Sequence, residues 1–67
     1  MTQEEIITML RENHKRMLLN KRQTARELNI SQGSLDKLRR DGAIKSRKVL
    51  GQVMFDIGEV ARFMAEA

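Results

Sequence analysis

The segment 20–42, NKRQTARELNISQGSLDKLRRDG, constrains the fold of this chain more than any other. Asn20 and Ser31 are both helix-capping residue types, and apolar or small residues recur at helical spacing after each of them. Between the two runs lies Asn29, a residue type that tolerates positive φ. The spacing therefore predicts two short helices, at about 21–28 and 32–41, joined by a tight turn.

The side chains of this segment also follow a known order. Ala25 places a small residue where the two helices cross, Asn29 comes four residues later, and apolar positions follow at Ile30, Leu35 and Leu38. This order is typical of a DNA-binding helix-turn-helix, although Gly is commoner than Asn at the turn. We therefore expect a helix-turn-helix over residues 20–42.

An amphipathic helix is expected before this segment. Thr2 and Glu5 have the spacing of a capping box, and apolar side chains follow at Ile6, Met9 and Leu10. The pattern predicts a helix over about 3–15, followed by a short apolar connector at 17–19. The apolar face of this helix suits packing on the rest of the domain or contact with a second copy of the chain. We expect His14, on the same helix, to be exposed to solvent.

After residue 42 the pattern is typical of strands. Residues 44–49 and 53–55 read as two short strands around a turn that contains Gly51. Asp56 is a candidate N-cap for a last helix, with Glu59 at the capping-box position. The prediction is one α-rich (α+β) domain over 1–67, a winged helix-turn-helix with an N-terminal helix, helix-turn-helix 20–42, a two-stranded hairpin wing 43–55 and C-terminal helix 56–66.

The composition argues against several classes of function. The chain has no cysteine and one histidine, so we expect no disulfide, no metal site and no cofactor. The carboxylates fall at helix faces or caps, no serine is placed beside a base, and no Gly-rich phosphate loop appears, so we do not expect an enzyme. No apolar run approaches the roughly 20 residues of a membrane span, so we expect no membrane partner and a location in the cytoplasm.

The positive charge of the chain is concentrated just after the second predicted helix. Residues 37–48 carry six basic side chains and one acidic side chain, while residues 1–36 carry six basic and five acidic side chains. The net charge of the whole chain is +4. A concentrated basic patch beside a helix that would enter a groove indicates a polyanionic partner.

The expected DNA-binding surface combines the second helix with the hairpin. Gln and Ser at the start of a recognition helix can read base edges, whereas Lys and Arg position the protein on phosphates or reach a guanine. Basic side chains on a hairpin can enter an adjacent minor groove. We expect Asp36 to point away from the phosphates or to accept from cytosine. The candidate DNA-binding residues are Ser31, Gln32, Ser34, Lys37, Arg39, Arg40, Arg22, Lys45, Arg47 and Lys48.

These segments resemble a known group of proteins. The stretches "RRDGAI", "KSRKVLGQVMF" and "DIGEVARFM" are similar to the winged helix-turn-helix of phage excisionases and of AlpA-type and MerR-type DNA-binding domains. The residues that carry the resemblance are Ala25, Leu28, Ile30, Ser31, Leu35, Gly42 and Asp56 through Phe63. The resemblance covers roughly residues 18–64.

The resemblance implies a small phage or mobile-element regulator that binds specific double-stranded DNA sequences, often at repeated sites, with DNA bending, gene regulation or DNA recombination as the output. It also implies a homodimer or cooperative multimer on DNA, with a recombinase as a further partner. Two alternatives stay open. One is a protein-interaction module of the anti-repressor type that uses the N-terminal helix. The other is a packaging component, because "NKRQTARELNIS" also resembles the small terminase subunit of lambdoid phages.

Overall fold

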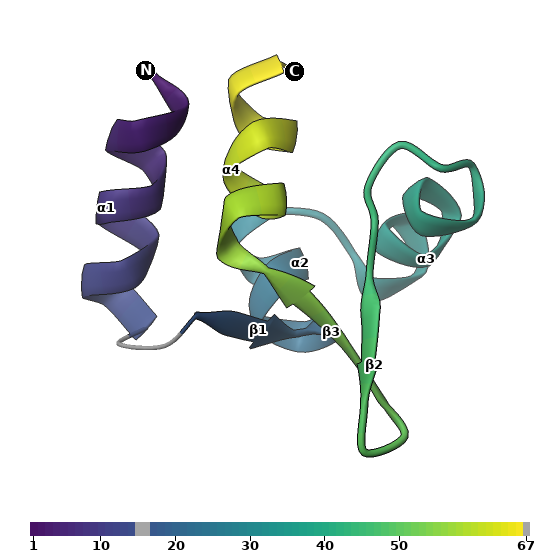
Figure 1. Ribbon diagram of the computed structural model, residues 1–67. Coiled ribbons are helices and arrows are strands. Elements are labelled where there is room, and N and C mark those ends of the chain that lie inside the picture. The colour runs from purple at the N-terminus through teal and green to yellow at the C-terminus, as the bar shows by residue number, and fades with distance from the viewer. Residues whose placement is uncertain (15–16, 67) are drawn as a thin grey trace.

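Four helices and a three-stranded antiparallel sheet make up the computed structural model, which describes residues 1–14 and 17–66 (Figure 1). Helices α1 and α4 stand side by side, and the two termini lie at the same end of the molecule. The β2–β3 hairpin projects from the opposite end. The elements in chain order are α1 (Gln3–His14), β1 (Leu18–Asn20), α2 (Lys21–Leu28), α3 (Gln32–Arg40), β2 (Arg47–Val49), β3 (Gln52–Asp56) and α4 (Ile57–Glu66).

The helices begin at the residues that the sequence predicts, because each start has a cap. Before α1, the Glu5 amide donates to Thr2 Oγ1 at 3.1 Å, and the Thr2 amide donates to Glu5 Oε1 at 2.9 Å. Asn20 caps α2 and forms a capping box with Gln23. Helix α1 is confirmed as far as its last described residue, and the predicted end at residue 15 lies outside the described residues.

The turn between α2 and α3 is built on one left-handed residue. Asn29 has φ 57° and ψ 44°, a conformation that Asn tolerates better than most residues with a side chain. Its amide donates to the Arg26 carbonyl at 3.1 Å, and the Ile30 amide donates to the Ala25 carbonyl at 3.0 Å. These two bonds form a Schellman motif, which ends α2. The prediction of a tight turn at Asn29 is confirmed.

A similar motif ends α3. Gly42 has φ +79°, and its amide donates to the Arg39 carbonyl, while the Ala43 amide donates to the Leu38 carbonyl. Helix α3 therefore ends at Arg40, one residue before the predicted end at 41.

The sheet has a strand that the sequence analysis did not predict. Leu18 and Leu19, expected in the connector 17–19, form β1 (Leu18–Asn20) together with the predicted cap Asn20. This strand pairs with β3, so the sheet order is β1-β3-β2. The predicted hairpin is confirmed as β2 and β3, but β2 begins at Arg47 rather than at residue 44. Ile44 is buried in the core instead, 1% exposed. Three-residue strands are too short to reveal themselves by alternation alone.

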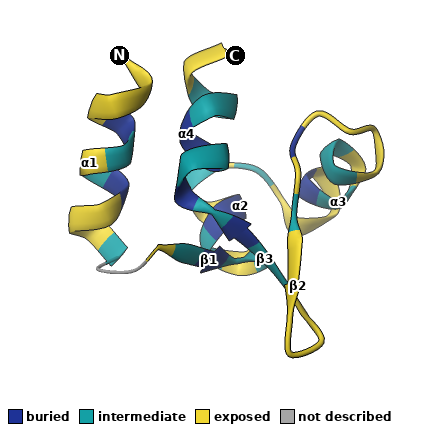
Figure 2. Ribbon diagram, in the orientation of Figure 1, coloured by how far each residue is buried: buried dark blue, intermediate teal, exposed yellow. Residues whose placement is uncertain are grey.

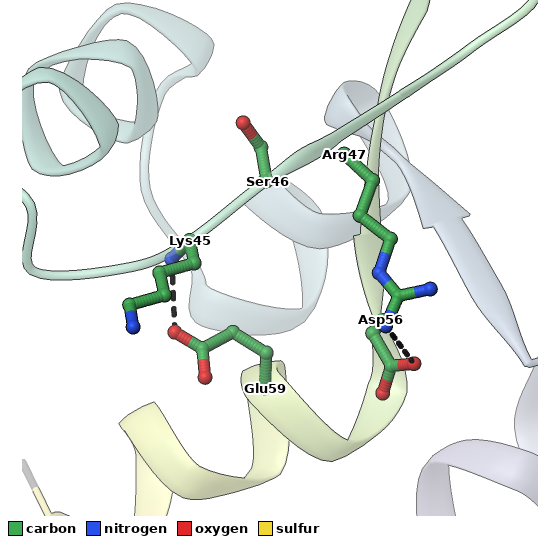
Figure 3. Close-up of a pocket in the computed structure, with 5 residues that line it drawn as sticks. All are labelled: Lys45, Ser46, Arg47, Asp56 and Glu59. Atoms are coloured by element: carbon green, nitrogen blue, oxygen red, sulfur yellow. Dashed lines mark hydrogen bonds and ion pairs between the residues drawn. The ribbon is translucent and has the colours of Figure 1, made fainter.

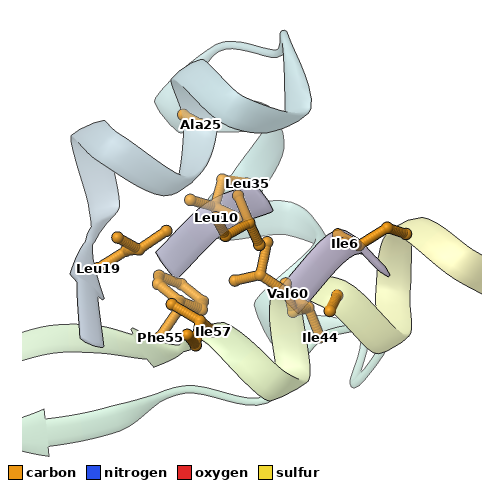
Figure 4. Close-up of a cluster of buried hydrophobic side chains, with 10 residues drawn as sticks. Ile6, Leu10, Leu19, Ala25, Leu35, Ile44, Phe55, Ile57 and Val60 are labelled. Atoms are coloured by element: carbon orange, nitrogen blue, oxygen red, sulfur yellow. The ribbon is translucent and has the colours of Figure 1, made fainter. Parts of the chain in front are cut away.

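The core lies between the helices and the inner face of the sheet (Figures 2 and 4). Phe55 of β3 is its largest fully buried side chain. Ile6 and Leu10 of α1 are 3% and 0% exposed and belong to the same cluster, so α1 packs on the domain and against α4. The full buried apolar set is Ile6, Leu10, Leu19, Ala25, Leu35, Ile44, Phe55, Ile57, Val60 and Ala61.

Two local predictions are wrong. His14 is not a free surface residue, because its Nε2 lies 2.7 Å from Glu27 Oε1 and links the end of α1 to α2. Asp56 does accept from the Gly58 amide at 2.7 Å, as expected of a cap at the start of α4. Glu59, however, does not complete a capping box, since it accepts from the Lys45 amide and from Arg62. The Lys45 amide lies 14 residues away in the chain, so no short-range motif reveals this contact, whereas Arg62 is an i, i+3 neighbour on the same helix.

Within the described ranges, none of the helices combines the length and apolar character needed to cross a lipid bilayer.

Replacing Thr24 with Val should stabilise the domain. Thr24 is fully buried, and its Oγ1 has no hydrogen-bond partner among the described residues. An unsatisfied buried hydroxyl costs about 1–3 kcal/mol, and Val has nearly the same shape. We expect Thr24→Val to raise the free energy of unfolding in urea by about 1 kcal/mol. Thr8→Val, at an exposed threonine of α1, is the matched control and should change it little. A less stable Thr24→Val would contradict this explanation.

Candidate nucleic-acid interface

Helix α3 turns one face to the core and the opposite face to solvent. Leu35 is fully buried and Leu38 is half-buried, so these side chains hold the helix on the domain. Residues three and four apart share a helical face, which places the remaining positions outward. The exposed residues of α3 are Gln32, Gly33, Ser34, Lys37 and Arg40.

The two serines at the start of α3 serve the helix start. Ser31 Oγ accepts from the Ser34 amide at 3.1 Å and donates to Ser34 Oγ at 3.0 Å. The N-cap predicted at Ser31 is therefore confirmed. Ser34 keeps its own hydroxyl proton free to donate outward, whereas Ser31 is engaged through both functions of its hydroxyl.

Asp36 forms ion pairs with two basic side chains, which neutralise its charge. Lys21 Nζ lies 3.0 Å from Asp36 Oδ1, and the Arg39 guanidinium lies 3.2 Å from the same oxygen. These hydrogen bonds, first from Lys21 and then from Arg39, lower the pKa of Asp36. The triad ties the start of α2 to α3. Arg39 is thereby given a role within the fold, while the negative charge of Asp36 is masked from a polyanion.

The start of α3 meets the hairpin across a shallow depression. Gln32 of α3 and Gln52 of β3 both line it, together with Lys21 and Arg22 from the start of α2. Val53 completes the hairpin side. Asn20, at the end of β1, also lines it, so the depression brings four elements together beside the exposed Gln32.

The register of the hairpin places its two cations on opposite faces of the sheet. Lys48 pairs with Val53, and Arg47 pairs with Met54. Side chains at paired positions share a face of a sheet, and neighbouring positions alternate. Lys48 therefore lies on the face of Val53, which packs against the core, and Arg47 lies on the opposite face.

Five of the predicted site cations form no ion pair among the described residues: Lys45, in the loop before β2, and four cations on α2, α3 and β2. Arg22, Lys37, Arg40 and Lys48 are all exposed, and none forms an ion pair within residues 1–14 and 17–66. They come from α2, α3 and β2, on both sides of the depression or on the outer face of α3. An array of free cations of this kind attracts phosphate groups.

A second hollow, at the base of the hairpin, has mixed charge (Figure 3). Lys45, Ser46, Arg47, Asp56 and Glu59 line it. The Lys45 amide donates to Glu59 Oε2 at 2.8 Å, and the Arg47 guanidinium lies 3.9 Å from Asp56 Oδ2. The side chain of Arg47 stays 69% exposed, so this loose pair leaves it able to turn toward another anion.

Glu59 fixes the loop between α3 and β2. Arg62 donates to it from Nε and from a terminal nitrogen, both at 2.8 Å, and also donates to the Ala43 carbonyl at 3.0 Å. The hydrogen bonds from Arg62 are the main cause that lowers the pKa of Glu59 to about 2. Glu59 is therefore ionised at neutral pH and anchors the loop that leads into the hairpin.

The structure thus separates the predicted residues into three groups. Gln32, Ser34, Lys37, Arg40, Arg22 and Lys48 are exposed on or around the α3 face, whereas Ser31 and Arg39 hold local structure and Lys45 and Arg47 line the mixed-charge hollow. Sequence reasoning missed Gln52, because no local pattern places it opposite Gln32. It also missed Arg26, an exposed residue one helical turn after Arg22 that the i, i+4 spacing would have revealed.

In the part of the chain that the structure describes, no group of His, Asp and Glu side chains is arranged to hold a metal ion.

Comparisons of this chain with protein-family models, with curated proteins and with solved structures found no match. Its function must therefore be inferred from the geometry and charge of its own surface.

Glu59→Gln should make the stability of the domain less dependent on pH. The pKa of Glu59 is lowered in the folded state, so its charge stabilises the fold above the unfolded-state pKa of about 4.5 and loses this effect as pH falls toward 2. We expect Glu59→Gln to lower the free energy of unfolding by about 1 kcal/mol at pH 7. The difference should shrink between pH 4.5 and pH 2.

Urea unfolding of both proteins across this pH range measures the effect. Glu66→Gln removes the other carboxylate that contacts Arg62, at a side chain that is 64% exposed, and should have little effect at any pH. A stability difference for Glu59→Gln that stays constant down to pH 2 would show that charge is not its cause.

Proposed function

We propose that this chain is a winged helix-turn-helix protein that binds specific sequences in double-stranded DNA. The observation that carries the proposal is the depression where Gln32, at the start of α3, lies beside Gln52 and Val53 of the hairpin. In this proposal α2 and α3 are the helix-turn-helix, and β2–β3 is the wing.

Helix α3 has the properties of a recognition helix. Its N-terminal residues are exposed, and the N-terminal part of such a helix contacts base edges in the major groove. Gln32 can form a bidentate pair with adenine, and Lys37, on the outer face of the same helix, can reach a guanine or a phosphate. The burial of Leu35 on the opposite face keeps this orientation fixed.

The surrounding cations suit contacts to the DNA backbone. Arg22 at the start of α2, Arg40 at the end of α3 and Lys48 on the hairpin are exposed and free of carboxylate partners among the described residues. Contacts of this kind set the position of a protein on the duplex without reading its sequence. Arg39 and Lys21 form ion pairs with Asp36, and these pairs stabilise the position of α3 relative to α2.

The biological role that we propose is that of a phage or mobile-element regulator of the excisionase or AlpA-like type. Its support is the resemblance of the sequence over residues 18–64 together with the order of elements, in which a hairpin follows two turn-linked helices. On this proposal the output is control of transcription or of DNA recombination. A homodimer or cooperative multimer on DNA, and a recombinase, are the partners that the proposal adds.

The protein-interaction alternative is less well supported. It relies on the apolar face of α1, but Ile6 and Leu10 are buried in the core and would have to leave it to bind a partner. No feature of the described residues favours the packaging alternative over DNA recognition by a regulator.

The first test is selection of bound sequences from a random duplex library at two salt concentrations. A defined motif that is bound more weakly at high salt supports sequence-specific recognition. Direct repeats of the motif would favour the excisionase-like role. The absence of any enriched sequence at either salt concentration would contradict the proposal.

Variants at the α3 surface separate base readout from phosphate contact. Gln32→Ala should relax the preference at one base position, at a cost of about 1–3 kcal/mol. Arg40→Ala should weaken binding to all sequences alike and reduce the slope of log K against log salt by about 0.9. Fluorescence anisotropy titrations with the selected duplex and with single-base variants measure both effects.

Arg11→Ala is the matched control for charge. Arg11 is an exposed cation on α1, the helix at the far side of the molecule from α3 (Figure 1). Its removal changes the net charge by the same amount as Arg40→Ala but should leave the salt slope unchanged. If both variants reduce the slope equally, the DNA-binding surface is not where we place it.

A further inference from the structure

The tip of the β2–β3 hairpin carries an apolar side chain in an unfavourable setting. Val49 pairs with Gln52, so Leu50 and Gly51 form the two-residue loop between the strands. Leu50 has φ +51° and Gly51 has φ +81°. Two positive φ values define a type I′ turn, for which Asn-Gly is the preferred sequence.

Leu50 is unfavourable here for two reasons. A left-handed conformation is sterically unfavourable for a residue with a Cβ atom. In addition, Leu50 is 100% exposed, so its side chain contacts no part of the core. Asn at this position would relieve the backbone and remove the apolar exposure, and neither the turn nor the core explains the choice of Leu.

The charges around the tip indicate the kind of surface that Leu50 suits. Residues 45–53 contain three basic side chains and no acidic one. Lys48 lies on one face of the hairpin and Arg47 on the other, by the register of the strands. Leu50 extends roughly 10 Å beyond Arg47, at the rise of a β-strand. An apolar tip between two lateral cations matches a groove that has a phosphate backbone on each side.

We propose that Leu50 is a wedge that the hairpin inserts between base pairs in the minor groove of DNA. This inference rests on the proposed DNA-binding function and adds the mode of contact at the wing. Proteins that bind the minor groove often insert Leu, Phe, Ile, Met or Pro at a base step, which unstacks the step and kinks the duplex. Lys48 and Arg47 hold the two backbones while Leu50 enters between them.

The wedge predicts a sequence preference at a position that no hydrogen bond reads. Pyrimidine–purine steps such as TA and CA unstack most easily. The preferred site should therefore contain such a step beside the segment contacted by α3. The bound duplex should be bent by about 20–90°, as in other complexes with inserted side chains.

The test compares the wild-type protein with Leu50→Asn on the selected duplex. 2-Aminopurine, placed at successive positions of the duplex, fluoresces more strongly where the base is unstacked. We expect the wild-type protein to raise the fluorescence at one step and to bend the duplex, and Leu50→Asn to do neither. Its affinity should fall about tenfold, the order expected for one buried leucine side chain.

Loss of folding is not a concern for this variant, because Asn suits the turn. Leu50→Asn should raise Tm by about 4 °C, since the left-handed conformation becomes less costly. Met17→Asn is the matched control, because Met17 is also an exposed apolar residue, 56% exposed, but lies outside the hairpin. It should leave the fluorescence signal, the bend and the affinity unchanged.

The outcomes distinguish this inference from the proposed function. If the wild-type protein binds the duplex but raises the fluorescence at no position, the wedge is wrong and DNA binding stands. If Leu50→Asn unstacks and bends the duplex as the wild type does, the wedge is also wrong, and Leu50 is better explained as a contact with another protein. If the wild-type protein binds no duplex, both proposals are overturned.

Discussion

Burial of Phe55 in the middle strand is the constraint on which the rest of the structure depends. β3 is paired on both edges, with Leu19 opposite Phe55 and Lys48 opposite Val53. Leu19 and Phe55 are both fully buried, so burial fixes the β1–β3 register, and the two-residue turn at Leu50 and Gly51 fixes the register of the hairpin. The same register sets the direction of every hairpin side chain. The burial of Phe55 therefore determines that Lys48 lies on the core side of the sheet and Arg47 on the other side.

The charged side chains around α3 and the hairpin fall into two kinds: those paired within the fold and those left unpaired at the surface. Asp36 is held by Lys21 and Arg39, and Glu59 is held by Arg62, so these carboxylates stabilise the packing of α3 and of the loop after it. Their negative charge is neutralised where they lie. Arg22, Lys37, Arg40 and Lys48, by contrast, stay exposed and form no ion pair among the described residues, so positive charge is left on this part of the surface.

Local signals were sufficient for much of the fold. Asn20, Ser31, Asn29 and Gly42 fixed the ends of α2 and α3 to within one residue, because capping and positive φ depend on the residue itself and on neighbours within one turn. For the same reason, the exposed face of α3 followed from the spacing of its leucines.

The sequence by itself determined where helices begin and end and where positive charge collects, since both follow from residue type and spacing. Only the tertiary structure decided that Leu18–Asn20 is a strand, because its partner β3 lies more than 30 residues away in the chain. It also decided that Arg39 is held by Asp36 and that Gln52 lies near Gln32. These outcomes depend on how the core brings distant segments together, and core packing involves the whole chain at once.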